Sequence, residues 1–597
     1  MEKSIRLQGV GSKGAGNALS ALWSRARQNA GPLLVILFTL WLIVVPLILL
    51  IVFSFRSGTP WQPEGFTLQN YVNAYSTGDT YVMFFNTAVL ALVSTIFSVA
   101  IAVLFAFLTE RTDMPFRNVA WGLMLIPMAV PGLLFAISWT FLFSPRNGLI
   151  NLWLRELFSV VGFNIAEGPF NIYSLWGMIF LDSLRGVTTI FLMIVGAFRA
   201  MDPTLEEAAR VSGASNRVTF FRVFLPLLTP AILAAFMYSF MSSLESLEIA
   251  MVIGFPAGIY VFSTYIYFST LRFSPPQYGL SAALGVIFLI VSLFFVYLYR
   301  RAAGQAGKFA TITGKGYRPR LIHLGKWRYP AFFLFLGYFG LTILAPTLIL
   351  LWRSLTAFYI SPSWKALSFL SLDNYRFVFE EDKIFSATWN TIVIGMGTGT
   401  LTMLLALVVA WVVVRKQFRG KTLLDGVTFL PHALPGVIIG IAFIFLYLQP
   451  PLNQLQLYGT VWLIILGLTV GYIAFGSRTM TGAVTQIHRE LEEAGQVSGA
   501  KWRVVMFRIV LPLLLPAFIS GWIWVASHAL RSFSVPLILG AGDSRVLAVI
   551  MWDFWDEGLA GETTALGVLL IVALTILTVG GRWTVSRMSR WSHQEKA

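Results

Sequence analysis

The chain contains no cysteine among its 597 residues, so disulfides, thiolate metal sites and cysteine nucleophiles are excluded. Charge is also scarce: Asp, Glu, Lys and Arg make up 12% of the residues, whereas 57% are hydrophobic. A water-soluble protein of this length needs several domains with charged surfaces, and this chain has too little charge to cover them. The sequence also lacks the G-x-x-x-x-G-K-[ST] loop that binds nucleotide phosphates.

In place of charged surfaces, the chain has long apolar blocks of roughly twenty residues, the length that crosses a bilayer as a helix. We expect about twelve spans, near residues 32–54, 82–108, 119–143, 172–197, 228–253, 278–299, 331–353, 388–413, 426–448, 459–484, 514–540 and 564–583. The first block is long enough to span, and no small-residue cleavage site follows it, so we expect a retained helix. The sequence therefore predicts an all-α polytopic membrane protein.

The net charge of +16 reflects orientation in the membrane, because the basic residues lie in short segments between the apolar blocks. They do not gather on one face of a domain, as nucleic-acid binding requires. The basic segments lie at 3–27, 300–328, 415–421 and 582–590, whereas the loops at 380–382 and 543–562 are acidic. The positive-inside rule then predicts that both termini are cytoplasmic.

The chain repeats itself. The FFNT sequence around Asn86 recurs as TWNT around Asn390, 304 residues later (390 − 86), and PMAVPG at 127–132 recurs as PHALPG at 431–436. Later matches are 286 residues apart, so the loop after the third span is 18 residues shorter in the second half (304 − 286). Each half has an even number of spans, which makes the repeats parallel. We therefore divide the chain into a first repeat at 1–300, a basic cytoplasmic linker at 301–330 and a second repeat at 331–597.

The two repeats share a polar segment between their fourth and fifth spans, at 202–232 and 488–518, and the two copies align without a gap. Each copy predicts a short amphipathic helix, a sharp turn at Gly213 or Gly499, and a second helix that re-enters the membrane. A Pro-x-x-x-Pro spacing after the turn permits a kink at the point of re-entry.

These segments resemble the EAA-type cytoplasmic loop (EAA, then Gly, then Leu-Pro) of binding-protein-dependent ABC importer permeases. The resemblance covers nearly the whole chain. It is closest to the fused ferric-iron-type permeases, whose relatives handle thiamine, polyamines and phosphonates, and the stretches 243–261 and 529–540 give weaker support. The resemblance implies a type I ABC importer permease fold of two parallel six-helix repeats. It also implies that an ATPase docks on Glu206, Glu207, Ala208, Gly213, Glu492, Glu493, Ala494 and Gly499. The second copy departs from the motif at Gly495, where Ala is expected. Two outcomes are open: a looser docking helix, or a close contact that is kept because glycine is small.

Such a permease provides a translocation pathway by alternating access and is not itself an enzyme. The resemblance implies two copies of a cytoplasmic ABC ATPase subunit, which bind ATP and Mg. It also implies that the membrane is a bacterial inner membrane, with an extracytoplasmic solute-binding protein as a partner, a lipid surround and no nucleic acid. We expect no cofactor and no metal site on this chain. The solute is expected to be ferric iron, or a small organic, phosphonate-type or polyamine-type compound.

Charged side chains inside apolar spans are costly and usually functional. We therefore predict a translocation pathway or gate formed by Asp182, Arg185, Glu245, Glu248, His528 and Arg531. Glu245 and Glu248 are three residues apart, which predicts one shared helix face. The repeat places Arg531 opposite Glu245, with His528 one turn earlier. Three interpretations remain open: these groups contact the passing solute, or an arginine merely neutralises the glutamates and holds the halves together, or the span boundaries are misplaced and these residues lie in water.

Two other classes of protein fit the sequence less well. A secondary transporter can also have twelve spans in parallel halves, but it would not need two EAA-type loops. A membrane-embedded enzyme would need clustered His, Asp or Glu at a membrane face, and the sequence offers no such catalytic constellation.

Overall fold

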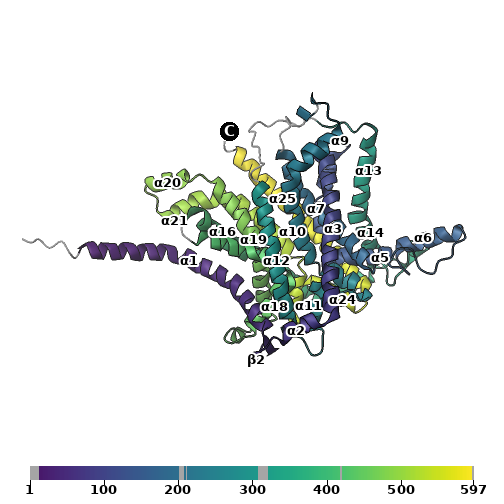
Figure 1. Cartoon of the computed structure of the whole chain (residues 1–597), viewed down its shortest axis with the longest axis horizontal. Helices are drawn as coiled ribbons and strands as arrows, with labels where there is room; N and C mark the ends of the chain where they lie inside the picture. Colours follow the sequence, from purple (N-terminus) through teal and green to yellow (C-terminus); the bar gives the residue numbers. More distant parts are fainter. Residues whose placement is uncertain (1–12, 201–207, 210, 307–320, 417–419, 595–597) are drawn as a thin grey trace, which may run out of the picture.

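The computed structural model describes residues 13–200, 208–209, 211–306, 321–416 and 420–594, and these residues are mostly helical. Figure 1 shows long helices packed side by side in one bundle, with α6 projecting on one side and α20 and α21 on the other. A small antiparallel hairpin, β1 (Arg56–Thr59) and β2 (Gln62–Phe66), follows the first helix.

The helices of the first repeat are α1 (Lys13–Ser54), α2 (Gln69–Ser76), α3 (Gly78–Arg111), α4 (Arg117–Leu123), α5 (Gly132–Phe143), α6 (Leu149–Val160), α7 (Leu175–Ala200), α9 (Asn216–Thr219), α10 (Leu225–Leu244), α11 (Phe262–Leu271) and α12 (Tyr278–Ala306). Those of the second are α13 (Arg328–Phe339), α14 (Ala345–Ser354), α15 (Asp373–Glu380), α16 (Asp382–Arg415), α17 (Lys421–Phe429), α18 (Gly436–Tyr447), α19 (Val461–Gln486), α20 (Glu490–Val497), α21 (Trp502–Val505), α22 (Leu511–Ala529), α23 (Ser534–Leu539), α24 (Leu547–Asp556) and α25 (Ala560–Gln594).

Within the described residues, ten helices are long and apolar enough to cross a membrane. The third and ninth predicted spans are instead bent pairs, in which Arg117–Met128 meets Gly132–Phe143 at 100° and Lys421–His432 meets Gly436–Tyr447 at 111°. Each bend falls in the repeated PMAVPG or PHALPG motif, because proline ends one helix and starts the next. The ten helices and these two bent pairs correspond to the expected twelve spans, and a third bent pair, Ala250–Ala257 with Phe262–Leu271 at 80°, follows the fifth span.

The fifth and eleventh spans end earlier than the sequence predicts. The expected blocks run to residues 253 and 540, but α10 stops at Leu244 and α22 stops at Ala529. After each break the chain turns and forms further short helical segments, including α11 in the first repeat and α23 and α24 in the second. The prediction that Glu245 and Glu248 share one helix face is therefore wrong, since both follow the break. Irregular backbone at this depth is tolerated where it is enclosed by protein or lines a cavity.

The repeated Asn-Thr motif holds the helix that follows each break. Thr87 Oγ1 accepts a hydrogen bond of 2.8 Å from the backbone N of Phe262, the first residue of α11. Thr391 Oγ1 accepts the corresponding bond of 2.9 Å from Leu547, the first residue of α24. The neighbouring Asn390 donates through Nδ2 to the carbonyl oxygens of Asp543 and Arg545, at 2.6 and 3.0 Å. The motif residues on α3 and α16 thus cap the N-termini of α11 and α24, respectively.

The two repeats interlock through their first helices. From α1, the Phe53 ring stacks on Phe445 of α18 with centroids 4.5 Å apart. From α13, Phe335 packs edge-on against Phe105 of α3 at 5.3 Å, and Tyr338 Oη donates to the carbonyl of Leu184 at 3.2 Å. Each repeat therefore completes the apolar packing of the other.

The described end of the predicted linker is tied to the first repeat; residues 307–320 lie outside the described part. The backbone N of Leu324 donates to Asp113 Oδ1 at 2.8 Å, and His323 Nδ1 lies 3.1 Å from Asp113 Oδ2. These contacts hold the pKa of the Asp113 carboxyl below its ordinary value, chiefly because the Leu324 N–H favours the charged form.

The capping role of Thr391 gives a first prediction. Thr391→Val keeps the side-chain shape but leaves the buried N–H of Leu547 without its acceptor, which should destabilise the fold by about 1 kcal/mol. The matched control is Thr388→Val, one turn earlier on α16, whose hydroxyl bonds only the carbonyl of Ile384 in its own helix. Thermal unfolding in detergent should show a lower Tm for Thr391→Val alone. Equal shifts in the two variants would contradict the capping role.

Candidate functional site

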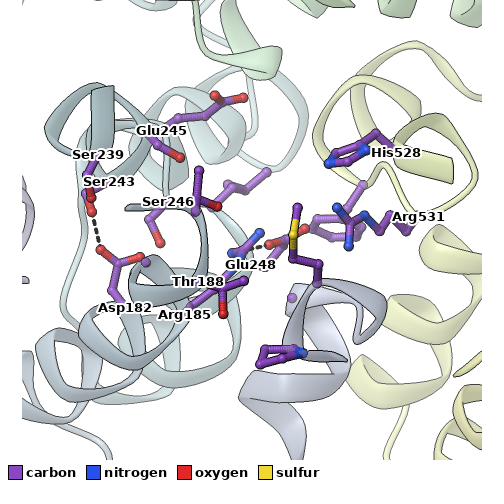
Figure 2. Close-up of a pocket in the computed structure, with 18 of the residues that line it drawn as sticks. Asp182, Arg185, Thr188, Ser239, Ser243, Glu245, Ser246, Glu248, His528 and Arg531 are labelled. Carbon is purple, nitrogen blue, oxygen red and sulfur yellow. Dashed lines mark hydrogen bonds and ion pairs between the residues drawn. The ribbon is translucent and has the colours of Figure 1, made fainter. Parts of the chain in front are cut away.

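A cavity of about 300 Å³ lies between the two repeats, beside the breaks that follow α10 and α22 (Figure 2). All six side chains that the sequence predicted for a pathway line it: Asp182, Arg185, Glu245, Glu248, His528 and Arg531. Figure 2 shows His528 and Arg531 on one side of the cavity and Asp182 and Glu245 on the other. The predicted residues, which come from α7 and from the ends of α10 and α22, are thus brought together.

Two charges of the first repeat neutralise each other at the cavity wall. Arg185 Nη1 lies 2.6 Å from Glu248 Oε2, and their side chains are 44% and 13% exposed. One helical turn away on α7, Asp182 accepts a short hydrogen bond from the Ser243 hydroxyl. The pairing of Arg185 with Glu248 agrees with the interpretation that an arginine neutralises a glutamate at the cavity.

Glu245 crosses from the first repeat to the second. Its Oε1 accepts a hydrogen bond of 2.7 Å from the backbone N of Gly436, the first residue of α18. A carboxylate is stabilised at a helix N-terminus, where free N–H groups carry partial positive charge. The bend in the PHALPG motif creates this N-terminus inside the membrane. The glutamate and the repeated motif together therefore join the two halves beside the cavity.

The second repeat contributes a cation that is placed differently. No described residue forms an ion pair or a hydrogen bond with the Arg531 guanidinium, which faces the cavity (Figure 2). His528 is held by its own helix: its Nδ1 lies 2.9 Å from the carbonyl oxygen of Trp524, and its ring stacks on that indole at 3.8 Å. Arg531 is thus the charged group of this wall that is left available to another partner.

Sequence reasoning missed the polar and aromatic remainder of the lining. Tyr472 of α19 and Gly132 at the start of α5 line the cavity, as do Ser239, Ser242, Ser246 and Ser532. The repeated PMAVPG motif was the available signal for Gly132, since it recurs at the equivalent helix start. Among the residues that the structure describes, no three His, Asp or Glu side chains converge as metal ligands.

The turn predicted in each docking loop has the same geometry in both repeats. Gly213 and Gly499 have φ of +79° and +81°, a conformation that favours glycine. After α20, the backbone N of Ala500 bonds the carbonyl of Gly495 at 3.1 Å, and Gly499 bonds Gln496 at 2.9 Å. This pair of bonds is a Schellman motif, which ends the helix and redirects the chain. Of the other docking residues of the first copy, Ala208 is described, whereas Glu206 and Glu207 lie outside the described residues.

The two predicted docking glutamates of the second copy point in different directions. Glu493 is 65% exposed, and its Oε1 lies 4.0 Å from Nε of Arg489, a similarly exposed residue just before α20. Glu492 is 12% exposed, and its Oε1 lies 2.8 Å from Nε of Arg415, the last residue of α16. Ala494 lies between Glu493 and the turn, on the same short helix. The structure therefore places Glu492 against its own repeat, where the sequence predicted an outward contact.

At Gly495 the docking helix keeps a close contact with the segment behind it, as the small size of glycine permits. A Cβ at this position would lie 3.0 Å from Val505 Cγ2 and 3.1 Å from Ile509 Cδ1, so the helix packs closely on the segment behind it. The first repeat has Ala, Thr and Val at the three equivalent positions, 209, 219 and 223. In the first repeat, Ala209 is one methyl group larger than Gly495, and Val223 is one methylene group smaller than Ile509. The two differences in volume therefore compensate each other.

Comparison with known proteins places both repeats in one family. The family described as the binding-protein-dependent transport system inner membrane component matches residues 98–304 and 402–590, once in each repeat. A ferric transport system permease protein of Actinobacillus pleuropneumoniae is 26% identical over 559 residues, covering 92% of this chain and 77% of that protein. A putative ferric transport system permease protein of Haemophilus influenzae is 27% identical, covering 87% and 79%. A spermidine/putrescine transport system permease protein of Haemophilus influenzae is 24% identical, covering 41% and 92%.

A second prediction tests the ion pair in the cavity wall. In Gly132→Ala, the new Cβ would lie 2.1 Å from Glu248 Oε2 and 2.8 Å from Arg185 Cζ, so the ends of these two side chains must shift. We expect a loss of about 1 kcal/mol in unfolding free energy, at the low end for overpacking, because flexible side-chain ends move more easily than backbone. Gly122→Ala is the control, because nothing lies within 4 Å of its Cβ. An unchanged Tm for Gly132→Ala in detergent would show that the pair is not held as described.

A third prediction concerns the packing behind the second docking helix. Gly495→Ala should lower the unfolding free energy by about 1–3 kcal/mol, since its Cβ would press on Val505 and Ile509. Adding Ile509→Val recreates the combination found in the first repeat and should recover part of that loss. The measurement is a double-mutant cycle of thermal stabilities in detergent. Strictly additive effects of the two substitutions would contradict the compensation.

Proposed function

Because the chain belongs to the binding-protein-dependent transport system inner membrane component family, it is the permease subunit of an ABC importer, and we propose that its cargo is ferric iron. The observation that carries the choice of cargo is the extent of the likeness. The ferric permeases of Actinobacillus and Haemophilus match 92% and 87% of this chain, and so extend through both repeats. The spermidine/putrescine relative is matched over 92% of its own length but extends over 41% of this chain, about one repeat.

The cavity between the repeats is the proposed passage for iron. Its carboxylates, on Asp182, Glu245 and Glu248, offer the hard oxygen ligands that highly charged cations favour. Each carboxylate already has a partner in the protein, respectively Ser243, the N–H of Gly436 and Arg185. Iron would therefore meet exchangeable contacts in place of a rigid cage. Weak contacts of this kind suit a conduction pathway, since a tight site would retain the ion.

The contact between Glu245 and Gly436 is the proposed gate. It joins the two repeats at the cavity, so their relative movement during alternating access would break and re-form it. Arg531 lies on the opposite wall, close enough to interact electrostatically with Tyr472 and Glu248, and no ion pair or hydrogen bond of its guanidinium is found among the described residues. In this proposal the positive charge of Arg531 compensates the carboxylates while the cavity is empty, and its side chain moves away when the cation enters. Contact of Arg531 with an anionic cargo is the competing role, and the experiment below separates the two.

The remaining parts of the importer are proposed from the two docking loops. The chain has no phosphate-binding loop, so ATP and Mg belong to two ABC ATPase subunits, one at each loop. The exposed Glu493 beside the Gly499 turn supports docking at the second loop. An extracytoplasmic binding protein delivers the solute. The chain needs no cofactor of its own, and both termini lie on the cytoplasmic side of a bacterial inner membrane.

A fourth prediction tests this function in proteoliposomes that contain the permease, its ATPase and an iron-loaded binding protein. Uptake of radiolabelled iron should require ATP and should persist when the proton gradient is collapsed. Arg531→Ala should lower uptake about tenfold or more, because the carboxylates are left unbalanced, and adding Glu245→Gln should restore part of it. Arg146→Ala is the control, since its side chain is 80% exposed and pairs with Glu167 away from the cavity.

Each alternative has its own outcome in this assay. Uptake driven by a proton gradient without ATP would indicate a secondary transporter. Uptake of a polyamine in place of iron would refute the proposed cargo. If no carboxylate substitution rescues Arg531→Ala, then Arg531 contacts an anionic solute and the gate proposal is wrong.

A further inference from the structure

The second docking helix, α20, is fastened to its own repeat by a buried ion pair. Arg415 Nε and Glu492 Oε1 face each other at 2.8 Å, and each side chain is 12% exposed. Neither of these two atoms makes a hydrogen bond with any described residue, so the contact between them is an ion pair by distance and charge. Arg415 Nη2 also donates to the carbonyl of Ile487 at 2.7 Å, in the short segment that leads into α20.

Arg415 is the last residue of the long helix α16 (Asp382–Arg415), which has 34 residues. At 1.5 Å per residue, this helix is about 51 Å long. The indole of Trp411, one turn before Arg415, packs edge-on against Trp502 behind the docking turn, with ring centroids 6.5 Å apart. The cytoplasmic end of α16 therefore contacts the docking loop on both sides of its turn.

The middle of α16 packs closely against the helix that ends at the cavity. A Cβ on Gly395 would lie 2.6 Å from Leu530 Cδ2, and one on Gly399 would lie 3.2 Å from Trp522 Nε1. Such close approach of two helices depends on the small residues at the contact. Leu530 stands at the end of α22, directly before Arg531 of the cavity wall. A shift of α16 along its axis would therefore reach the break that carries Arg531.

The other end of α16 holds the outer part of the repeat. Asn390 and Thr391 bind the backbone of residues 543–547 at the start of α24. The single helix α16 thus contacts the docking loop, the break at the cavity and the N-terminus of α24. Its contact with α20 itself is the buried Arg415–Glu492 pair.

We propose that Glu492 is a positioning residue for energy coupling, which acts through Arg415 to make α20 and α16 move as one body. The exposed Glu493 on the same helix makes the contact with the ATPase. This inference rests on the proposed function, since it takes α20 to be an ATPase docking helix. It departs from the motif's implication that both glutamates of the second copy are docking contacts.

The experiment uses the full importer in proteoliposomes and compares Glu492→Gln with Glu493→Gln. Two quantities are measured: the ATPase that copurifies with the permease, and the ATP hydrolysis that the binding protein stimulates. With Glu492→Gln, the amount of copurified ATPase should stay within about twofold of that with the unchanged protein. The ATP hydrolysis stimulated by the binding protein should fall about tenfold, because Arg415 is left as an unpaired buried charge and α20 is no longer held to α16. Glu493→Gln should instead reduce the retained ATPase. The exchange Arg415→Glu with Glu492→Arg should restore most of the stimulation.

The absence of native cysteine permits a second test that does not depend on charge. Arg415→Cys with Glu492→Cys should abolish the stimulation while the thiols are free. Bridging the two thiols with a bifunctional reagent should then restore it, because a covalent link replaces the ion pair. A restored response cannot come from a contact of Glu492 with the ATPase.

Two results would overturn the inference. The first is loss of the ATPase from Glu492→Gln to the same extent as from Glu493→Gln, with no rescue by the charge exchange. The second is a completed thiol bridge that leaves the stimulation absent. Both readouts are independent of the cargo, so failure to import iron would refute the proposed cargo while the role of Glu492 is still decided.

Discussion

Backbone N–H and C=O groups inside a bilayer have no water to bind, and the rest of this structure depends on that constraint. The chain interrupts its spanning helices after Leu244 and Ala529 and bends them just before Gly132 and Gly436. Three of these four sites line the cavity, and the fourth donates its free N–H to Glu245 of the lining. The polar groups that the breaks expose are thus used to build the site between the repeats.

The two repeats share a fold but divide the charges of the cavity between them. By the 286-residue offset, Arg185 corresponds to Gly471, Asp182 to Leu468 and Glu248 to Ser534. A symmetric pair of first repeats would bring two sets of carboxylates to one cavity, and mutual repulsion would oppose their ionisation. Replacing one set by Arg531 and neutral groups relieves this repulsion. Fusion of the repeats in one chain allows the two walls to differ.

The two docking loops likewise keep the same backbone turn while their side chains differ. The turns at Gly213 and Gly499 have nearly the same φ. Behind them, the first repeat has the larger residue at one position and the smaller at the other (Ala209 and Val223), and the second repeat has the reverse (Gly495 and Ile509). Close packing explains why the two changes occur together, since a gain in volume at one site requires a loss at its neighbour. A departure from the motif is therefore not by itself evidence of a weaker contact.

The sequence alone determined the number of spans, their parallel repeat, the docking turns and the six charged or imidazole side chains of the cavity. These features follow from hydrophobic length, self-similarity, glycine geometry and the cost of charge in lipid, all of which are local or periodic. Only the tertiary structure decided where the fifth and eleventh spans break and which partner each charge has. Glu245 binds Gly436, which is 191 residues away, and Glu492 faces Arg415 across two helices. Such partners are chosen by packing between distant elements, and no local pattern in the sequence encodes that choice.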